Sequence, residues 1–91
     1  MPASSNEDVF VPWGPDAVGQ PAQIAVVPAT AGEPVDADYR NATWIDGEAS
    51  LHVGAGTDLE LEPGVYVIWS RVTIGDRRPV RRSGVLTVGN P

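Results

Sequence analysis

The residues of this chain that could take part in chemistry are few and scattered. The sequence has one histidine, His52, and no cysteine that would complete a metal-ligand set with it. Two pairs of acids, Asp36 with Asp38 and Asp46 with Glu48, are spaced two apart as in calcium-binding loops. The glycine and the distal glutamate of such a loop are absent from both pairs, which favours solvated acidic loops.

Nucleophilic catalysis is equally poorly supported. The serines Ser70 and Ser83 lack the G-x-S-x-G frame of a hydrolase, and the absence of cysteine excludes thiol catalysis and iron–sulfur clusters. We therefore expect no catalytic residue, no metal site and no cofactor. The hypothesis that follows is a domain that acts through its surface.

Charge is divided unevenly along the chain. Every basic residue is an arginine, and the net charge is −6. Residues 1–62 carry eleven acids and one arginine, whereas residues 63–91 carry five arginines and one acid. Such a division suits docking between unlike surfaces, including copies of the chain itself, although drift of surface charge explains it equally well. The overall acidity argues against binding to nucleic acid.

Helix breakers restrict the secondary structure. Nine prolines and ten glycines are spread along 91 residues, so we expect at most a single helical turn, near Pro15–Val18. Short β-rich segments separated by turn residues are typical of a β-sandwich. The predicted strands are Val9–Val11 at an edge, Gln23–Val27, Ala42–Ile45, Ser50–Val53, Asp58–Leu61, Val65–Ile74 and Gly84–Val88.

Two of these segments carry specific signals. Asp46-Gly47 predicts a two-residue hairpin between Ala42–Ile45 and Ser50–Val53. Val65–Ile74 alternates with apolar residues on both faces, which predicts a central strand covered on both sides. Asp58–Leu61 alternates as well, with Leu59 and Leu61 expected to face inward.

The segment Leu61–Tyr66 resembles the tyrosine corner of immunoglobulin-like sandwiches. A leucine closes one strand, Pro63-Gly64 makes a turn, and Tyr66 stands early on the next strand, where its hydroxyl can bond to turn backbone. We therefore predict an all-β, immunoglobulin-like antiparallel β-sandwich of about seven short strands. Residues 1–20 are expected to form an extended N-terminal arm, and residues 21–91 the sandwich domain.

The last third of the chain resembles a known family. The string runs through Gly64–Thr73, Arg77–Val80 and Ser83–Val88. It is similar to the closing "GxYxVWVRVTD…PV…GxLxV" string of small immunoglobulin-like structural proteins of tailed bacteriophages. This resemblance implies a virion component of the head, neck or tail. A capsid decoration (minor capsid) protein that cements the shell in many symmetric copies is the first expectation. A ring component of the neck or tail is the second.

The implied partners are the phage major capsid protein or other virion subunits, with a homo-oligomer or symmetric array, and without nucleic acid or membrane. The start, Met1–Asp8, lacks the basic and apolar regions of a signal peptide, and no apolar run approaches the ~20 residues needed to cross a bilayer. We expect synthesis in the host cytoplasm and residence in the virion. A carbohydrate- or receptor-binding module that uses Trp13 or Trp44 is the alternative from another class.

Candidate partner-binding residues are one tryptophan and four arginines. Trp13 follows a proline near the N-terminus, where it either docks into a neighbour's pocket or folds back on its own sandwich. Trp69 is expected in the core, and Trp44 in either place. The arginines, expected at a charged hairpin tip, either pair with carboxylates of an adjacent subunit or form a solvated turn; they are Arg77, Arg78, Arg81 and Arg82.

Overall fold

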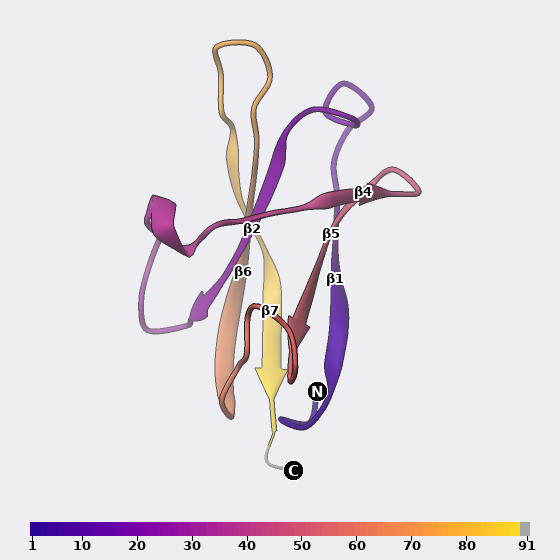
Figure 1. Ribbon diagram of the computed structural model, residues 1–91. Helices are drawn as coiled ribbons and strands as arrows, with labels where there is room; N and C mark the ends of the chain where they lie inside the picture. Colours follow the sequence, from indigo (N-terminus) through magenta and orange to yellow (C-terminus); the bar gives the residue numbers. More distant parts are fainter. Residues whose placement is uncertain (90–91) are drawn as a thin grey trace.

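Two antiparallel β-sheets packed face to face make up the computed structural model, which describes residues 1–89 (Figure 1). One sheet has three strands in the order β1-β5-β4, and the other has four in the order β3-β2-β6-β7. The strands are β1 (Asn6–Pro12), β2 (Ala22–Pro28), β3 (Arg40–Asn41), β4 (Thr43–Ile45), β5 (Glu48–Gly54), β6 (Gly64–Val72) and β7 (Val80–Val88). The predicted all-β sandwich of about seven short strands is therefore confirmed.

The strand order is that of an immunoglobulin-like domain with a reduced first strand. The sheets correspond to B-E-D and C′-C-F-G of that fold. Strand A is represented only by a parallel bridge between Pro2 and Gly89. The amine of Met1 also donates a hydrogen bond of 2.7 Å to the carbonyl of Thr87. The start of the chain thus holds the end of β7.

The segment of residues 1–20, predicted as an extended arm, is extended but does not project from the sandwich. β1 pairs with β5 over its whole length, from Asn6 opposite Gly54 to Pro12 opposite Glu48. It is an edge strand, as predicted for Val9–Val11. The sandwich of the described residues therefore begins with β1 rather than at residue 21, because the apolar side chains of β1 supply part of the core.

The predicted Asp46-Gly47 hairpin joins β4 to β5. Asp46 and Gly47 have φ values of 50° and 82°, which is the pair of positive φ angles that a type I′ turn requires. The predicted single helical turn near Pro15–Val18 is wrong. Hydrogen-bonded turns occupy that loop, and the only helical element within residues 1–89 is the 3-10 turn η1 at Asp36–Asp38.

The predicted central strand is β6, which lies between β2 and β7. The strand predicted at Asp58–Leu61 is wrong, because its backbone closes a local turn instead of joining a sheet. The amide of Gly54 donates to the carbonyl of Leu59, and the Thr57 hydroxyl donates to the same carbonyl. Leu59 and Leu61 nevertheless face inward as predicted and pack against the core.

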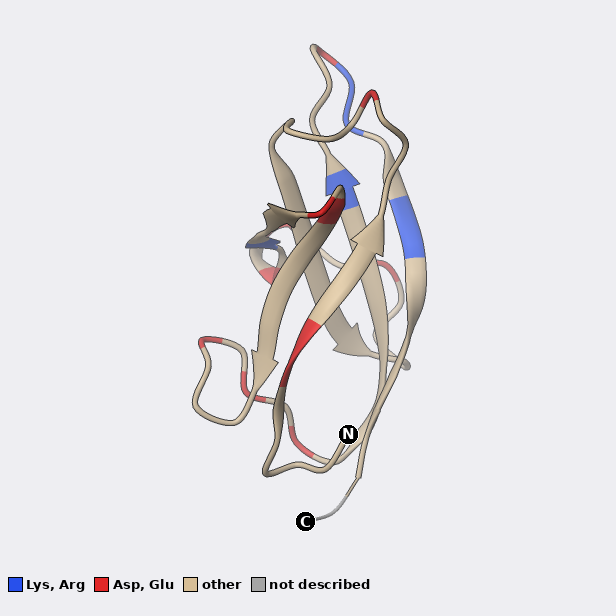
Figure 2. Ribbon diagram, turned by 90° about the vertical axis from the view of Figure 1, so that its right-hand side faces the viewer, with Lys and Arg blue, Asp and Glu red and all other residues tan. Residues whose placement is uncertain are grey.

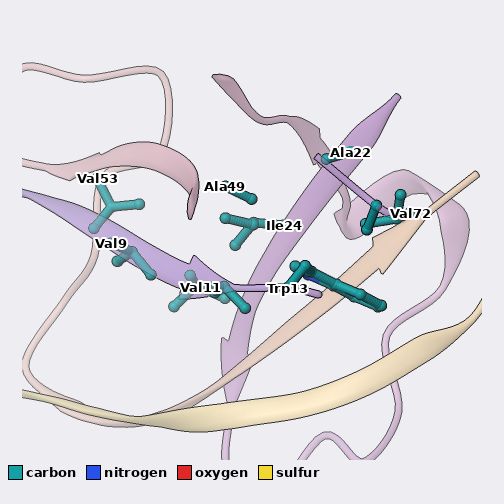
Figure 3. Close-up of a cluster of buried hydrophobic side chains, with 10 residues drawn as sticks. Val9, Val11, Trp13, Ala22, Ile24, Ala49, Val53 and Val72 are labelled. Atoms are coloured by element: carbon teal, nitrogen blue, oxygen red, sulfur yellow. The ribbon is translucent and has the colours of Figure 1, made fainter. Parts of the chain in front are cut away.

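The core between the sheets is built mainly from small and β-branched side chains (Figure 3). Ile24, Val53 and Val72 have no exposed surface. Burial of each such side chain stabilises the fold by about 1.5–3 kcal/mol. The cluster comprises Val9, Val11, Trp13, Ala17, Ala22, Ile24, Val26, Ala49, Val53 and Val72. It spans both sheets and thereby fixes the position of β6 against the three-stranded sheet.

The corner predicted at Leu61–Tyr66 is present. The Tyr66 hydroxyl donates a hydrogen bond of 2.7 Å to the main-chain carbonyl of Glu62, four residues upstream. The ring packs against the core cluster. This contact fixes the entry of β6 and thereby sets which face of the strand is turned inward.

Candidate functional site

The connection between β6 and β7 is a protruding hairpin tip. β2 accompanies β6 only as far as Val72, and the chain then continues to a turn at Gly75-Asp76. Two backbone hydrogen bonds between Ile74 and Arg77, of 2.9 and 3.0 Å, close this turn. Figure 1 shows the tip extending past the neighbouring strands of its sheet. Arg77 and Arg78 are exposed there, as the prediction of a charged tip requires.

Positive charge gathers on this hairpin (Figure 2). Five of the six arginines of the chain lie between residues 71 and 82, with Asp76 as the one acid in that stretch. Figure 2 shows one red segment at the tip of this hairpin and the other red segments spread over the rest of the ribbon. We call residues 71–82 the basic hairpin. Its guanidinium groups are suited to bidentate contacts with carboxylates.

Arg81 and Arg82 point to opposite faces of β7. A register shift between Ile68 and Trp69 places Trp69 opposite Arg82 and Ser70 opposite Arg81. Both arginines are exposed, but the Arg81 guanidinium lies over the Trp13 ring, 4.0 Å from its centroid. Arg81 is therefore engaged within its own domain, and the four predicted arginines do not form one flat patch.

Trp13 is a core residue rather than an exposed anchor. It is 9% exposed and belongs to the buried cluster, so of the two predicted placements the structure has the one folded back on the sandwich. The reason is its position directly after β1, where the chain turns in between the sheets (Figure 3). The prediction that Trp13 docks into the pocket of a neighbouring subunit is therefore wrong. Buried in this way, it also offers no face to a sugar ring.

The other two tryptophans occupy different environments. Trp44 is half-buried against the core and donates a hydrogen bond of 2.7 Å to the carbonyl of Gln20. Trp69, expected in the core, lies instead on the face of β6 that is turned away from the other sheet, opposite Ala25 of β2. Its indole nitrogen is buried without a hydrogen-bond partner among residues 1–89. The correction follows from the inward position of Tyr66, because residues 66 and 69 lie on opposite faces of a strand.

The face that carries Trp69 is an apolar surface, here called the outer face. Several of its side chains are buried without belonging to the core cluster, among them Ala25, Val27 and Val67. Toward β7 it is open: Val65 is 50% exposed and Val85 is 58% exposed. The side chains that share this face are Gln23, Ala25, Val27, Val65, Val67, Trp69, Arg71, Val80, Arg82, Val85 and Thr87.

Arg71 is the centre of a polar cluster that the sequence did not reveal. It is 9% exposed, and its guanidinium lies 3.9 Å from the centroid of the Tyr39 ring. It donates hydrogen bonds of 2.8 Å to Gln23 Oε1 and 2.7 Å to Asp36 Oδ1. The hydrogen bond and the charge of Arg71 hold the pKa of Asp36 below its usual value. The cluster ties the η1 segment to the β2 side of the outer face.

A cleft of about 380 Å³ adjoins this cluster between β2, β3 and the base of the basic hairpin. Arg71 and Arg78 line it together with Gln23 and Asn41. Asp36 already pairs with Arg71 in the chain, so the cluster serves to hold η1 in place. The one feature of the sequence that could have indicated this cluster is Arg71 itself, a charged residue on an otherwise apolar face of β6.

His52 lies away from these features, on the outer side of the three-stranded sheet. Its Nδ1 is 2.8 Å from Asp8 Oδ1, and both side chains are about half exposed. Within residues 1–89 no three side chains of histidine, cysteine, aspartate or glutamate are grouped to hold a metal ion. The hydroxyls of Ser70 and Ser83 lie 2.7 Å apart and bond to each other.

The fold and these surfaces define the class of protein as an immunoglobulin-like β-sandwich with a basic hairpin and an apolar outer face. No family model, curated protein or solved structure is significantly similar to the chain. Along residues 1–89 no helix is long and apolar enough to span a membrane.

Proposed function

We propose that this domain is a structural, non-enzymatic component of a tailed-phage virion, and specifically a capsid decoration protein. The observation that carries the proposal is the resemblance of residues 64–88 to the closing string of small phage structural proteins. That string now coincides with two complete strands, β6 and β7, and the turn between them. The stretch that resembles virion proteins is therefore also the most basic part of the molecule.

The basic hairpin supports this proposal as a docking element. Arg77 and Arg78 are exposed at its tip, where their guanidinium groups can reach carboxylates on a neighbouring subunit. The rest of the chain carries a formal charge of −10 over residues 1–62, which orients the hairpin toward an acidic surface and turns the body away from it. A cementing role follows when many symmetric copies bridge adjacent shell subunits.

The size of the domain supports the same role. A chain of 91 residues without cysteine has a thin core and no disulfide to reinforce it. Binding to a shell stabilises the folded state, and the gain rises with the logarithm of the ratio of free binding-site concentration to Kd. A decoration protein of this kind is stabilised by its binding to the shell, and its surface contacts stabilise the shell.

The test is the protein content of virions from the phage that encodes the chain. Quantitative mass spectrometry should find on the order of hundreds of copies per particle for a shell protein, whereas about six or twelve would indicate a neck or tail ring. Absence from purified virions would overturn the proposal. The double variant Arg77→Glu/Arg78→Glu should fold normally but be lost from particles, and Arg77→Lys/Arg78→Lys serves as its charge-preserving control.

A further inference from the structure

The outer face is half covered by the chain itself and half open. On the β2 side, Tyr39 is buried and lies over Arg71, so the segment that contains η1 covers this part of the sheet. On the β7 side the chain provides no such cover, and Val65 and Val85 are each at least half exposed. Val80, on the same face, is 41% exposed. An open apolar strip on one sheet face favours contact with another protein surface.

The outer side of the three-stranded sheet differs in character. It carries the Asp8–His52 ion pair, and Ser50 lies beside Phe10 in the register of β1 and β5. Phe10 and Ile45 are exposed there at 46% and 42%. The buried residue beside Phe10 is the polar Ser50, whereas the buried residue opposite Val85 on the outer face is the apolar Val67, so the two sides of the sandwich are not equivalent.

Charges of opposite sign flank the open strip. On the β7 side, the exposed Arg82 stands opposite Trp69. On the β2 side, acids surround the buried tyrosine. Burial raises the pKa of the Tyr39 hydroxyl against the lowering effect of Arg71, and the charges of Glu33, Asp36 and Asp38 raise it further. Asp36, which is exposed and pairs with Arg71, and Asp38 belong to the η1 turn directly before Tyr39, and Glu33 lies in the loop that leads into this turn, at the edge of the outer face that is remote from β7.

We propose that the outer face binds the outer face of a second copy of this chain, in a two-fold symmetric dimer whose axis runs along β6. A rotation of 180° about that axis places β7 of one copy over the β2 side of the other. Arg82 then meets the acids of the η1 segment, and Val65 meets the apolar centre of the partner's face. The arrangement is isologous, with the charges complementary on both sides of the axis.

The area that the two outer faces can bury limits the affinity of this dimer. A standard interface buries about 800 Å² per partner, which is about 15% of the 5306 Å² surface of the chain. The apolar centre is small and the rim is charged, which indicates a weak dimer whose affinity falls as salt rises. Two copies joined in this way leave the tips of both basic hairpins free.

Sedimentation velocity on the purified full-length chain, from low micromolar to near-millimolar concentration, tests the proposal. The sedimentation coefficient should rise from the monomer value to the dimer value, and the midpoint should move to higher concentration at high salt. Val85→Glu should weaken association by at least about tenfold, because a carboxylate would be buried in the apolar centre. Circular dichroism confirms that each variant is folded.

Matched variants separate this face from the rest of the molecule. The double variant Phe10→Ser/Ile45→Thr removes exposed apolar side chains from the other side of the sandwich and should dimerise like the parent chain. Arg82→Glu and Glu33→Arg should each weaken the dimer, and their combination should restore it. A chain that stays monomeric throughout, or a dimer that Val85→Glu leaves intact, overturns the inference. Neither result bears on the virion content that tests the proposed function.

Discussion

The guanidinium of Arg81 lies 4.0 Å from the centroid of the Trp13 indole ring, and this contact joins the two ends of the chain. Trp13 directly follows β1 of the three-stranded sheet, and Arg81 lies near the start of β7 of the other sheet. At the opposite end of the sandwich, the amine of Met1 donates a hydrogen bond to the carbonyl of Thr87. β1 and β7 are therefore connected at both ends, although no complete strand A lies between them.

Truncation of Trp13 should destabilise the whole domain. Trp13→Ala should lower the free energy of unfolding by about 3–5 kcal/mol, because it empties the space of a large buried side chain. Trp13→Phe should cost less than half as much, since it keeps an aromatic ring and removes an indole nitrogen that is buried without a partner. Urea denaturation followed by circular dichroism measures both. If Trp13→Ala were as stable as the parent chain, the N-terminal segment would be a free arm after all.

The corner hydrogen bond should contribute a smaller and separable amount. Tyr66→Phe removes only the hydroxyl that donates to the Glu62 carbonyl and should cost about 0.5–1.5 kcal/mol. Glu62→Gln is the control, because it changes the side chain and leaves the accepting main-chain carbonyl in place. Thermal and urea unfolding of the two variants should therefore diverge. Equal stability of Tyr66→Phe and the parent chain would show that the ring alone holds the corner.

Much of the fold was predictable because its signals are local. Asp46-Gly47 defines a hairpin through the positive φ angles it tolerates, and the apolar residues on both faces of Val65–Ile74 identify β6 as a central strand, although its outer face stays partly open at Val65. The corner at Tyr66 depends on residues four apart in sequence. Interactions of this range are encoded within a single short segment. The strands and the fold class can therefore be predicted from such segments. Asp58–Leu61 is the exception, because its apolar and polar residues alternate as in a strand while its backbone forms a turn.

The environments of the tryptophans were not predictable in the same way. Alternation shows that Val67 and Trp69 share a face, but both faces of β6 are apolar and the pattern does not say which one meets the other sheet. The inward position of Tyr66 at the corner was the signal that could have settled it. Trp13 presented the opposite difficulty, since its burial depends on contact with β7, which is remote in sequence. The Arg71 cluster likewise joins three distant segments.

The Asp36–Arg71 pair should make part of the stability depend on pH. The hydrogen bond and charge of Arg71 lower the pKa of Asp36 in the folded chain below its value of 3.8 in the unfolded chain. The folded state therefore favours the carboxylate, and this contribution is fully present above the unfolded pKa and is lost as pH falls through the folded pKa.

Denaturation of the parent chain and Asp36→Asn, compared from neutral pH to about pH 2, checks this sign. The parent chain should be more stable at neutral pH, and the difference should vanish in acid. Glu60→Gln, which removes an exposed carboxylate from the loop before β6, controls for the general effect of charge. A stability difference that grew as the pH fell would contradict the assignment.

Gly54 should be the least replaceable glycine, because it combines an unusual backbone angle with a close contact. Its φ is +108°, and a Cβ there would overlap the carbonyl oxygen of Ser5 and approach the Asn6 Cα to 2.9 Å. Gly54→Ala should therefore cost more than the ~1 to 3 kcal/mol of backbone strain alone and should disturb the pairing of β5 with β1.

Gly56→Ala is the matched variant, because Gly56 has a positive φ of +77° but open space around the added methyl group. It should show the backbone strain without the steric overlap. The difference between the two free energies of unfolding then measures how tightly the start of the chain is held against β5. Equal losses would mean that residues 1–5 move aside freely, and the contacts of Met1 with β7 would contribute little to stability.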